Sequence, residues 1–143
     1  MRIAWAIVVL VVSVPCWLGQ VISWWSPDLA VRWSLQEAEA DVEPVFWADA
    51  RAEAMWDSLT LWTLVVAGGL LLIDHGAWAT WGLVGGAMYL YFAGRGIATR
   101  LEMRRRRFRI GAVTDVRTGL VACAVWGLVG ATTLVAAAAS IES

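Results

Sequence analysis

Apolar residues in this chain gather in four long stretches instead of alternating with polar ones. The stretches cover residues 3–23, 45–73, 77–98 and 118–139 approximately. A bilayer core about 30 Å thick is crossed by about 20 helical residues that each rise 1.5 Å, so each stretch is long enough to span it. The pattern predicts an all-α fold: a four-helix transmembrane bundle that forms a single integral membrane domain over residues 1–143.

The first stretch has features of both a membrane anchor and a cleaved signal peptide. Arg2 precedes an apolar run, as it does in signal peptides. The run is about 20 residues long, however, and Trp17, Trp24 and Trp25 stand where small cleavage-site residues belong. We therefore expect an uncleaved anchor, kinked at Pro15.

The segment after the first stretch predicts an additional short amphipathic helix at the membrane interface. Ser26 is a typical N-cap residue, and Pro27 suits the first helical position. Trp33 would then lie at headgroup depth. Ser34, followed by Glu37, is a second helix start of the capping-box type.

Composition supports a membrane protein. Hydrophobic residues make up 60% of the 143 residues and charged residues only 16%, and the mean hydropathy is +0.66. A small soluble domain has too high a surface-to-volume ratio to bury so much apolar surface. Eleven basic residues, all of them Arg, nearly cancel twelve acids. These numbers exclude intrinsic disorder and an overall basic nucleic-acid module.

The opposite charges are concentrated in two connectors, which we call the acidic connector (residues 24–57) and the Arg-rich connector (residues 99–117). With four spans, both must emerge on the same side of the membrane. Short Arg-rich loops stay in the cytoplasm, while acids count little in this rule. The sequence therefore predicts a prokaryotic cytoplasmic-membrane protein with both termini outside and both connectors inside.

The shared location predicts a charged interface between the connectors. We expect some arginines of residues 100–109 to pair with acids of the acidic connector, and the arginine cluster to attract anionic lipid headgroups. The charged interface comprises Arg104, Arg105, Arg106, Arg107, Glu37, Glu39, Asp41 and Glu43.

A polar stripe enters the second span. Asp49, Glu53 and Asp57 recur every four residues, which places them on one helical face, and Thr60 continues it. The stripe has two interpretations. It is either the wall of a polar vestibule that binds a cation or the polar end of a lipid-like molecule, or it is a solvated helix end that pairs with arginines. Tryptophans deeper in the spans would either line a pocket or fill the core. The candidate ligand-binding residues are Glu53, Asp57, Thr60, Trp17, Trp62 and Trp126.

Small residues predict close packing of the third and fourth spans. Gly82 and Gly86 form a small-xxx-small pair in the third span, and Gly127 and Gly130 are small residues of the same kind in the fourth span. Such faces let another helix backbone approach, either within this chain or from a membrane-protein partner or a second copy.

Candidate chemistry is sparse. Asp74-His75-Gly76 predicts a tight turn between the second and third spans, with Gly76 in the left-handed conformation. A carboxylate beside the only His could tune a general base. Neighbouring side chains in a tight turn seldom point together, however, so the pair favours helix capping at an exposed turn. Cys16 and Cys123 suit apolar core positions. The sequence predicts no metal and no cofactor.

These features lead to three alternatives for function. The first is a small non-catalytic accessory or assembly subunit that docks other membrane proteins. The second is a bundle that binds or senses a lipid-like or aromatic small molecule. The third is a membrane enzyme that uses Glu53, Asp57 or His75. The lipid bilayer is an expected partner in each case, and nucleic acid in none.

Overall fold

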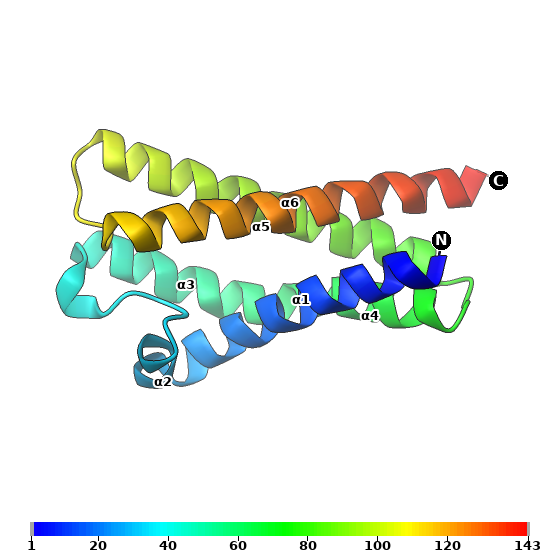
Figure 1. Ribbon diagram of the computed structural model, residues 1–143, viewed down its shortest axis with the longest axis horizontal. Helices are drawn as coiled ribbons and strands as arrows, with labels where there is room; N and C mark the ends of the chain where they lie inside the picture. Colours follow the sequence, from blue (N-terminus) through cyan, green and yellow to red (C-terminus); the bar gives the residue numbers. More distant parts are fainter. Residues whose placement is uncertain (1, 143) are drawn as a thin grey trace.

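The computed structural model describes residues 2–142, whose long helices lie lengthwise beside one another (Figure 1). In chain order these are α1 (Arg2–Trp25), α2 (Pro27–Arg32), the 3-10 helix η1 (Glu39–Asp41), α3 (Pro44–Thr60), α4 (Trp62–Leu72), α5 (Trp78–Arg105) and α6 (Val113–Glu142). No β-strand occurs within residues 2–142. The all-α prediction is therefore confirmed for this part of the chain.

Three helical stretches are long and apolar enough to cross a membrane: α1, the α3–α4 pair over Pro44–Leu72, and α6 over Val113–Ile141. They correspond to the first, second and fourth predicted spans, and they are compatible with an integral membrane protein. α5 corresponds to the third predicted span and has 28 residues. It is not among the three, because Gly, Trp, Tyr and Arg residues lower its hydropathy.

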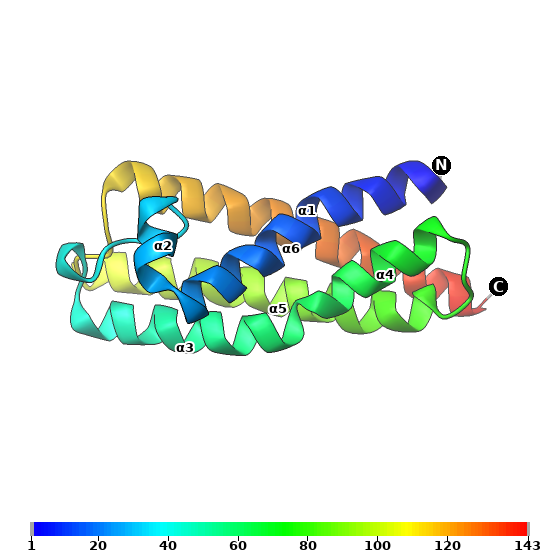
Figure 2. The same ribbon diagram turned by 90° about the horizontal axis from the view of Figure 1, so that it is seen from below.

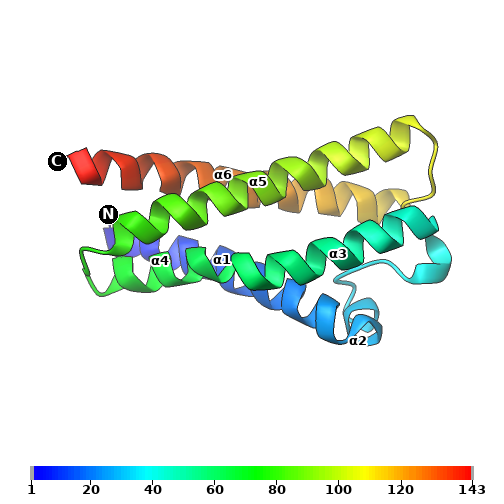
Figure 3. The same ribbon diagram turned by 180° about the vertical axis from the view of Figure 1, so that it is seen from behind.

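α3 and α4 form one rod with a local irregularity at Leu61 (Figure 3). Leu61 keeps helical angles, with φ −73° and ψ −16°, so the rod continues, although Figure 2 shows α4 inclined to the axis of α3. The hydroxyls of Ser58, Thr60 and Thr63 donate hydrogen bonds of 2.7–3.0 Å to nearby main-chain carbonyls. Such bonds compete with the helical ladder and bend helices, which accounts for the irregularity.

Both connectors lie at one end of the molecule, and the two ends of the chain lie at the other (Figure 1). Val42 and Ile110 form an isolated antiparallel β-bridge between the connectors. The Glu43 N–H donates a hydrogen bond of 2.7 Å to the Arg109 carbonyl oxygen. A buried apolar cluster adjoins this contact and consists of Val42, Phe46, Ile110 and Val116. The two oppositely charged connectors therefore touch each other, through backbone and apolar side chains.

α2 begins where the sequence predicts it. Pro27 occupies the first helical position and Ser26 the N-cap position, although the Ser26 side chain makes no cap hydrogen bond. The second predicted start, at Ser34, is not formed. Ser34 has a left-handed φ of +55°, and the Leu35 N–H donates to the Ala30 carbonyl at 2.8 Å, which closes the end of α2.

The turn between α4 and α5 differs in detail from the prediction. Asp74, with φ +60°, takes the left-handed conformation expected of Gly76. Arg2 forms an ion pair with the Asp74 carboxylate, so the start of α1 is fastened to this turn. His75 Nδ1 accepts a hydrogen bond of 3.2 Å from the Ala77 N–H. Asp74 and His75 therefore have separate partners, and the His75 side chain bonds to the turn just before α5.

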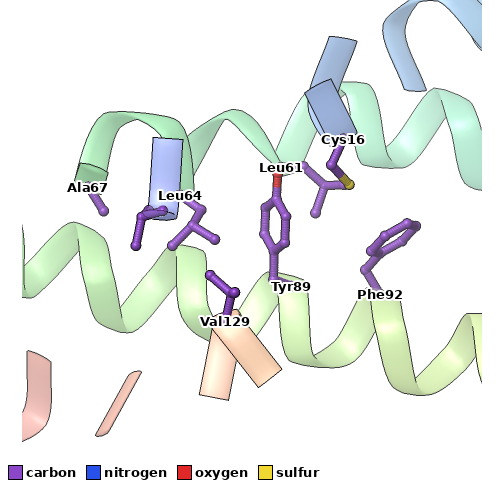
Figure 4. Close-up of a cluster of buried hydrophobic side chains, with 8 residues drawn as sticks. Cys16, Leu61, Leu64, Ala67, Tyr89, Phe92 and Val129 are labelled. Carbon is purple, nitrogen blue, oxygen red and sulfur yellow. The ribbon is translucent and has the colours of Figure 1, made fainter. Parts of the chain in front are cut away.

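The main core lies where α1, α4, α5 and α6 meet (Figure 4). Tyr89 reaches into it from α5 and is fully buried. Its hydroxyl donates a hydrogen bond of 2.9 Å to the Ser13 carbonyl of α1, which satisfies the polar end of the ring. The buried residues of this core are Val9, Cys16, Leu61, Leu64, Ala67, Tyr89, Phe92 and Val129.

α5 and α6 make the most extensive helix contact, and glycines allow it. A Cβ on Gly86 would lie 2.7 Å from the Gly130 carbonyl oxygen. Cβ atoms on Gly82 and Gly127 would lie 2.9 Å and 3.0 Å from alanine side chains of the facing helix. All four glycines thus face the other helix of the same chain, which leaves none of them free to receive a second protein.

Candidate ligand-binding cleft

An open cleft of about 930 Å³ lies at the connector end of the molecule, lined by α1, α5, α6 and both connectors. It forms because α1 runs diagonally across the structure (Figure 2). α1 packs against α3 and α4 but makes few contacts with α6, so α6 is left uncovered at that end. The volume falls within the range of small-molecule sites, roughly 300–1,000 Å³.

The cleft has an aromatic floor and a charged mouth. Phe92 of α5 and Trp126 of α6 form the aromatic floor, with ring centroids 5.4 Å apart. Gln20 of α1 and Glu53 of α3 also line the cleft. The charged mouth consists of Glu37, Asp41, Arg100, Arg109 and Asp115. A molecule with an apolar part and a charged part would match this distribution.

The first two acids of the polar stripe share one arginine. Arg95 of α5 lies 2.5 Å from Asp49 Oδ1 and 2.7 Å from Glu53 Oε1. All three side chains are partly buried, with Glu53 only 15% exposed. This arrangement fixes α3 against α5 beside the cleft. Arg51, on the same helix as these acids, donates to the carbonyls of Ser23 and Trp24 at the end of α1.

The third acid of the stripe lies behind the cleft and not in its wall. Asp57 is 5% exposed, and its Oδ2 has no hydrogen-bond partner within the described chain. Thr60 donates to the Trp56 carbonyl at 3.0 Å and does not line the cleft. Of the predicted vestibule residues Glu53, Asp57 and Thr60, only Glu53 lines the cleft.

The three predicted tryptophans have different environments. The Trp17 indole donates a hydrogen bond of 2.9 Å to the Ser58 carbonyl, so it joins α1 to α3. The Trp62 indole donates to the Leu59 carbonyl at 2.8 Å, and its ring lies 5.3 Å from that of Trp81. Trp126 alone of the three lines the cleft.

The arginine cluster of residues 104–107 does not pair with the acidic connector. Within residues 2–142, Arg105 and Arg106 pair with Glu102 of their own helix at 3.7 Å and 2.7 Å. No ion pair in this range joins the cluster to Glu37, Glu39, Asp41 or Glu43. The physical reason is that backbone and apolar contacts hold the connectors together, and Arg105, 84% exposed, is turned to solvent.

Two arginines of the mouth are held without a carboxylate. Arg100 Nη1 donates to the Gly96 carbonyl at 3.2 Å, and its guanidinium lies 6.0 Å from the Phe46 ring centroid. A Cβ on Gly119 of α6 would lie 3.2 Å from Arg100 Nε, so this glycine leaves room for the side chain. Arg109 Nη2 donates a long bond of 3.5 Å to the Val42 carbonyl.

Sequence reasoning missed most residues of the cleft. Gln20 carried one usable signal, since an amide inside an apolar stretch requires a polar environment. Phe92, Arg100, Arg109 and Asp115 carried none, because their convergence depends on how far α1 diverges from α6.

Other chemistry is limited. Cys16 and Cys123 are free and buried. Within residues 2–142, no group of three or more His, Cys, Asp and Glu side chains is arranged to hold a metal ion. No protein-family model matches the sequence, and neither a curated protein nor a solved structure matches it significantly. Function is therefore argued from the cleft itself.

Proposed function

We propose that this protein binds an amphiphilic, lipid-like molecule in the cleft and acts as a non-catalytic binding or sensing protein of the membrane. The observation that carries the proposal is the cleft of about 930 Å³ with an aromatic floor and a charged mouth. Apolar pockets with a few convergent polar groups are typical of small-molecule sites. A protein that only docked partners would need no such opening beside its core.

The proposal places four helical rods across the bilayer, with α5 as the third span and α2 at the interface. α5 is long enough, and it packs between α4 and α6, both of which are parts of apolar stretches. Counted from the α4–α5 turn, a layer of about 30 Å ends near Glu53 on α3 and near Ile97 on α5. The connectors then lie on the cytoplasmic side, as the Arg-rich sequence favours, and both termini lie outside.

This placement puts the cleft across the inner membrane interface. Phe92 and Trp126 lie a few residues inside the apolar layer, while the charged mouth lies outside it. The exposed apolar side of the cleft, between α1 and α6, then faces hydrocarbon. A molecule that is already located at the inner membrane interface could enter the cleft without crossing the membrane.

The accessory-subunit alternative uses surfaces other than the glycine faces. Those faces are filled within the chain, but the arginines of residues 104–107 remain available to an anionic surface or partner. The enzyme alternative has less support. Asp57 does not line the cleft, and His75 belongs to the turn at the opposite end of the molecule. Glu53 does line the cleft, but Arg95 holds it in an ion pair.

The decisive experiment fills the cleft and measures bound lipid. Ala122 of α6 lines the cleft, whereas Ala124, two residues along, is exposed on the outer surface. We would purify the wild type, Ala122→Trp and Ala124→Trp in mild detergent, and count co-purified lipids by native mass spectrometry. The wild type and Ala124→Trp should retain a stoichiometric lipid, and Ala122→Trp should lose most of it.

Equal retention by both variants would show that the lipid lies elsewhere and would overturn the proposal. Absence of any lipid, together with a stoichiometric protein partner, would favour the accessory subunit instead. Monodisperse gel filtration of each variant shows that lost lipid does not reflect unfolding.

A further inference from the structure

We propose that the molecule bound in the cleft is a zwitterionic phospholipid whose headgroup joins a phosphate to a primary ammonium, the class of phosphatidylethanolamine. This inference rests on the proposed binding function and adds the identity of the headgroup. It is carried by charges of both signs that line one cleft without neutralising each other.

The cationic side of the mouth suits a phosphate. Arg100 and Arg109 line the cleft, and neither forms an ion pair within residues 2–142. Their protein contacts are with main-chain carbonyls and an aromatic ring, which leaves guanidinium donors free. Guanidinium groups bind phosphate oxygens through paired, charge-assisted hydrogen bonds.

The acidic side of the mouth suits an ammonium group. Glu37, Asp41 and Asp115 line the same cleft, and the described part of the chain gives none of them an ion pair. Asp115 accepts a hydrogen bond of 3.3 Å from the Thr114 hydroxyl and lies in the first turn of α6. Glu37 is packed over Gly111, where a Cβ would lie 2.7 Å from its Cγ.

Several opposite charges elsewhere in this protein do pair. Arg95 contacts Asp49 and Glu53, and Arg106 contacts Glu102. In the mouth, by contrast, arginines and carboxylates line one cleft, and none of them forms an ion pair within residues 2–142. An anionic headgroup would satisfy the arginines but face three carboxylates, and a cationic amphiphile would have the reverse problem. A zwitterionic headgroup satisfies both sets.

The aromatic floor adds a requirement for acyl chains. Phe92 and Trp126 offer apolar surface continuous with the mouth, on the hydrocarbon side of the interface. Burial of acyl chains supplies affinity that a headgroup alone lacks. The intact lipid should therefore bind, and the water-soluble glycerophosphoethanolamine should not compete with it.

The test compares lipids that differ in headgroup only. Delipidated full-length protein would be reconstituted into nanodiscs of dioleoyl-phosphatidylcholine that contain equal small amounts of dioleoyl-phosphatidylethanolamine and dioleoyl-phosphatidylglycerol. Lipids retained after detergent extraction would be counted by native mass spectrometry. We expect phosphatidylethanolamine to be retained about tenfold more than phosphatidylglycerol, since one lost charge-assisted bond is worth about that factor.

Variants that neutralise one arginine or one carboxylate of the mouth test whether the lipid needs both charges. Arg109→Gln and Glu37→Gln should each lower retention of phosphatidylethanolamine about tenfold. Arg100→Gln is a second variant of the cationic side of the mouth, and Asp115→Asn is a second variant of the acidic side. They are included because either first variant could also lose a packing contact. The matched controls Arg106→Gln and Glu102→Gln remove a pair outside the cleft and should change nothing.

Several outcomes would overturn the headgroup assignment while leaving the binding function intact. One is preferential retention of phosphatidylglycerol, with Glu37→Gln and Asp115→Asn without effect. Another is competition by glycerophosphoethanolamine, which would point to a soluble ligand. If neither lipid is retained and Ala122→Trp behaves as the wild type, the binding function itself fails.

Discussion

The hydroxyl of Tyr89 donates a hydrogen bond of 2.9 Å to the main-chain carbonyl of Ser13. This bond joins α5 to α1 through the main core, and both residues are fully buried. Replacement of the tyrosine by phenylalanine keeps the ring and removes the bond. Tyr89→Phe should lower the free energy of unfolding by about 1 kcal/mol.

Tyr91 offers a matched control for this change. It lies two residues further along α5 and is 64% exposed. Thermal unfolding in detergent should show a lower melting temperature for Tyr89→Phe and no shift for Tyr91→Phe. Equal shifts would mean that the buried bond contributes nothing to the contact between α1 and α5.

Arg95 provides a second prediction, because it is the shared counter-charge of two carboxylates. Arg95→Gln would leave Asp49 and Glu53 facing each other in a partly buried position. We expect a loss of about 2 kcal/mol, less than for a fully buried pair because the side chains are partly solvated. Arg106→Gln, at an exposed pair, should change stability by less than about 0.5 kcal/mol.

A double variant separates lost attraction from the remaining repulsion. In Arg95→Gln combined with Glu53→Gln, one of the two carboxylates is gone, so stability should recover relative to Arg95→Gln alone. Chemical denaturation in mixed micelles would measure both differences. A double variant as unstable as the sum of the two single ones would show that the groups act independently.

The sequence predicted the elements of this fold better than their mutual placement. Apolar runs marked α1, α6 and the α3–α4 rod, because burial in lipid requires such runs. The partner of Glu53 could not be predicted in the same way: it depends on the rotation and height of α5 relative to α3, which place Arg95 there and leave Arg105 in solvent. The cleft depends on the diagonal course of α1, a property of packing that no single residue encodes.

For Asp57 we expect a substitution to raise the stability of the protein, whereas the substitutions above lower it. It is buried, and its Oδ2 lacks a partner within residues 2–142. Burial of a carboxylate without a partner costs more than burial of a neutral amide, because the charged group loses more hydration. Asp57→Asn keeps the size and removes an ionisable group from apolar surroundings, so stability should rise by about 1 kcal/mol. Asp49→Asn, which loses the contact with Arg95, should lower it.

Thermal unfolding of Asp57→Asn and Asp49→Asn also shows whether Asp57 has a bound partner. They lie on the same face of one helix, two turns apart, and carry the same chemical change. If Asp57→Asn destabilises the protein as much as Asp49→Asn does, then Asp57 has a stabilising partner, such as a bound water or cation, and its side chain belongs to an occupied site.

Gly86 tests the contact between α5 and α6. A Cβ there would lie 2.7 Å from a backbone oxygen of Gly130, which cannot move without its helix. Gly86→Ala should therefore separate the helices and cost about 1–3 kcal/mol. A Cβ on Gly94, in the same helix, would meet nothing within 4 Å. Gly94→Ala should stabilise the helix by about 0.5–1 kcal/mol.

The proposed membrane orientation yields the last prediction, which uses single cysteines in a Cys16→Ala and Cys123→Ala background. Glu39 and Arg106 represent the two connectors, and His75 represents the turn at the other end; all three are exposed. A membrane-impermeant thiol reagent added to intact cells should label His75→Cys only. After permeabilisation it should also label Glu39→Cys and Arg106→Cys.

The pattern of labelling distinguishes an inverted orientation from a wrong fold. Because Val42 and Ile110 form a bridge between the connectors, Glu39→Cys and Arg106→Cys must respond together whichever way the protein is inserted. Labelling of both in intact cells would invert the orientation and place the charged mouth of the cleft outside. Labelling of one without the other would require an odd number of crossings between them, which the contact between the connectors forbids.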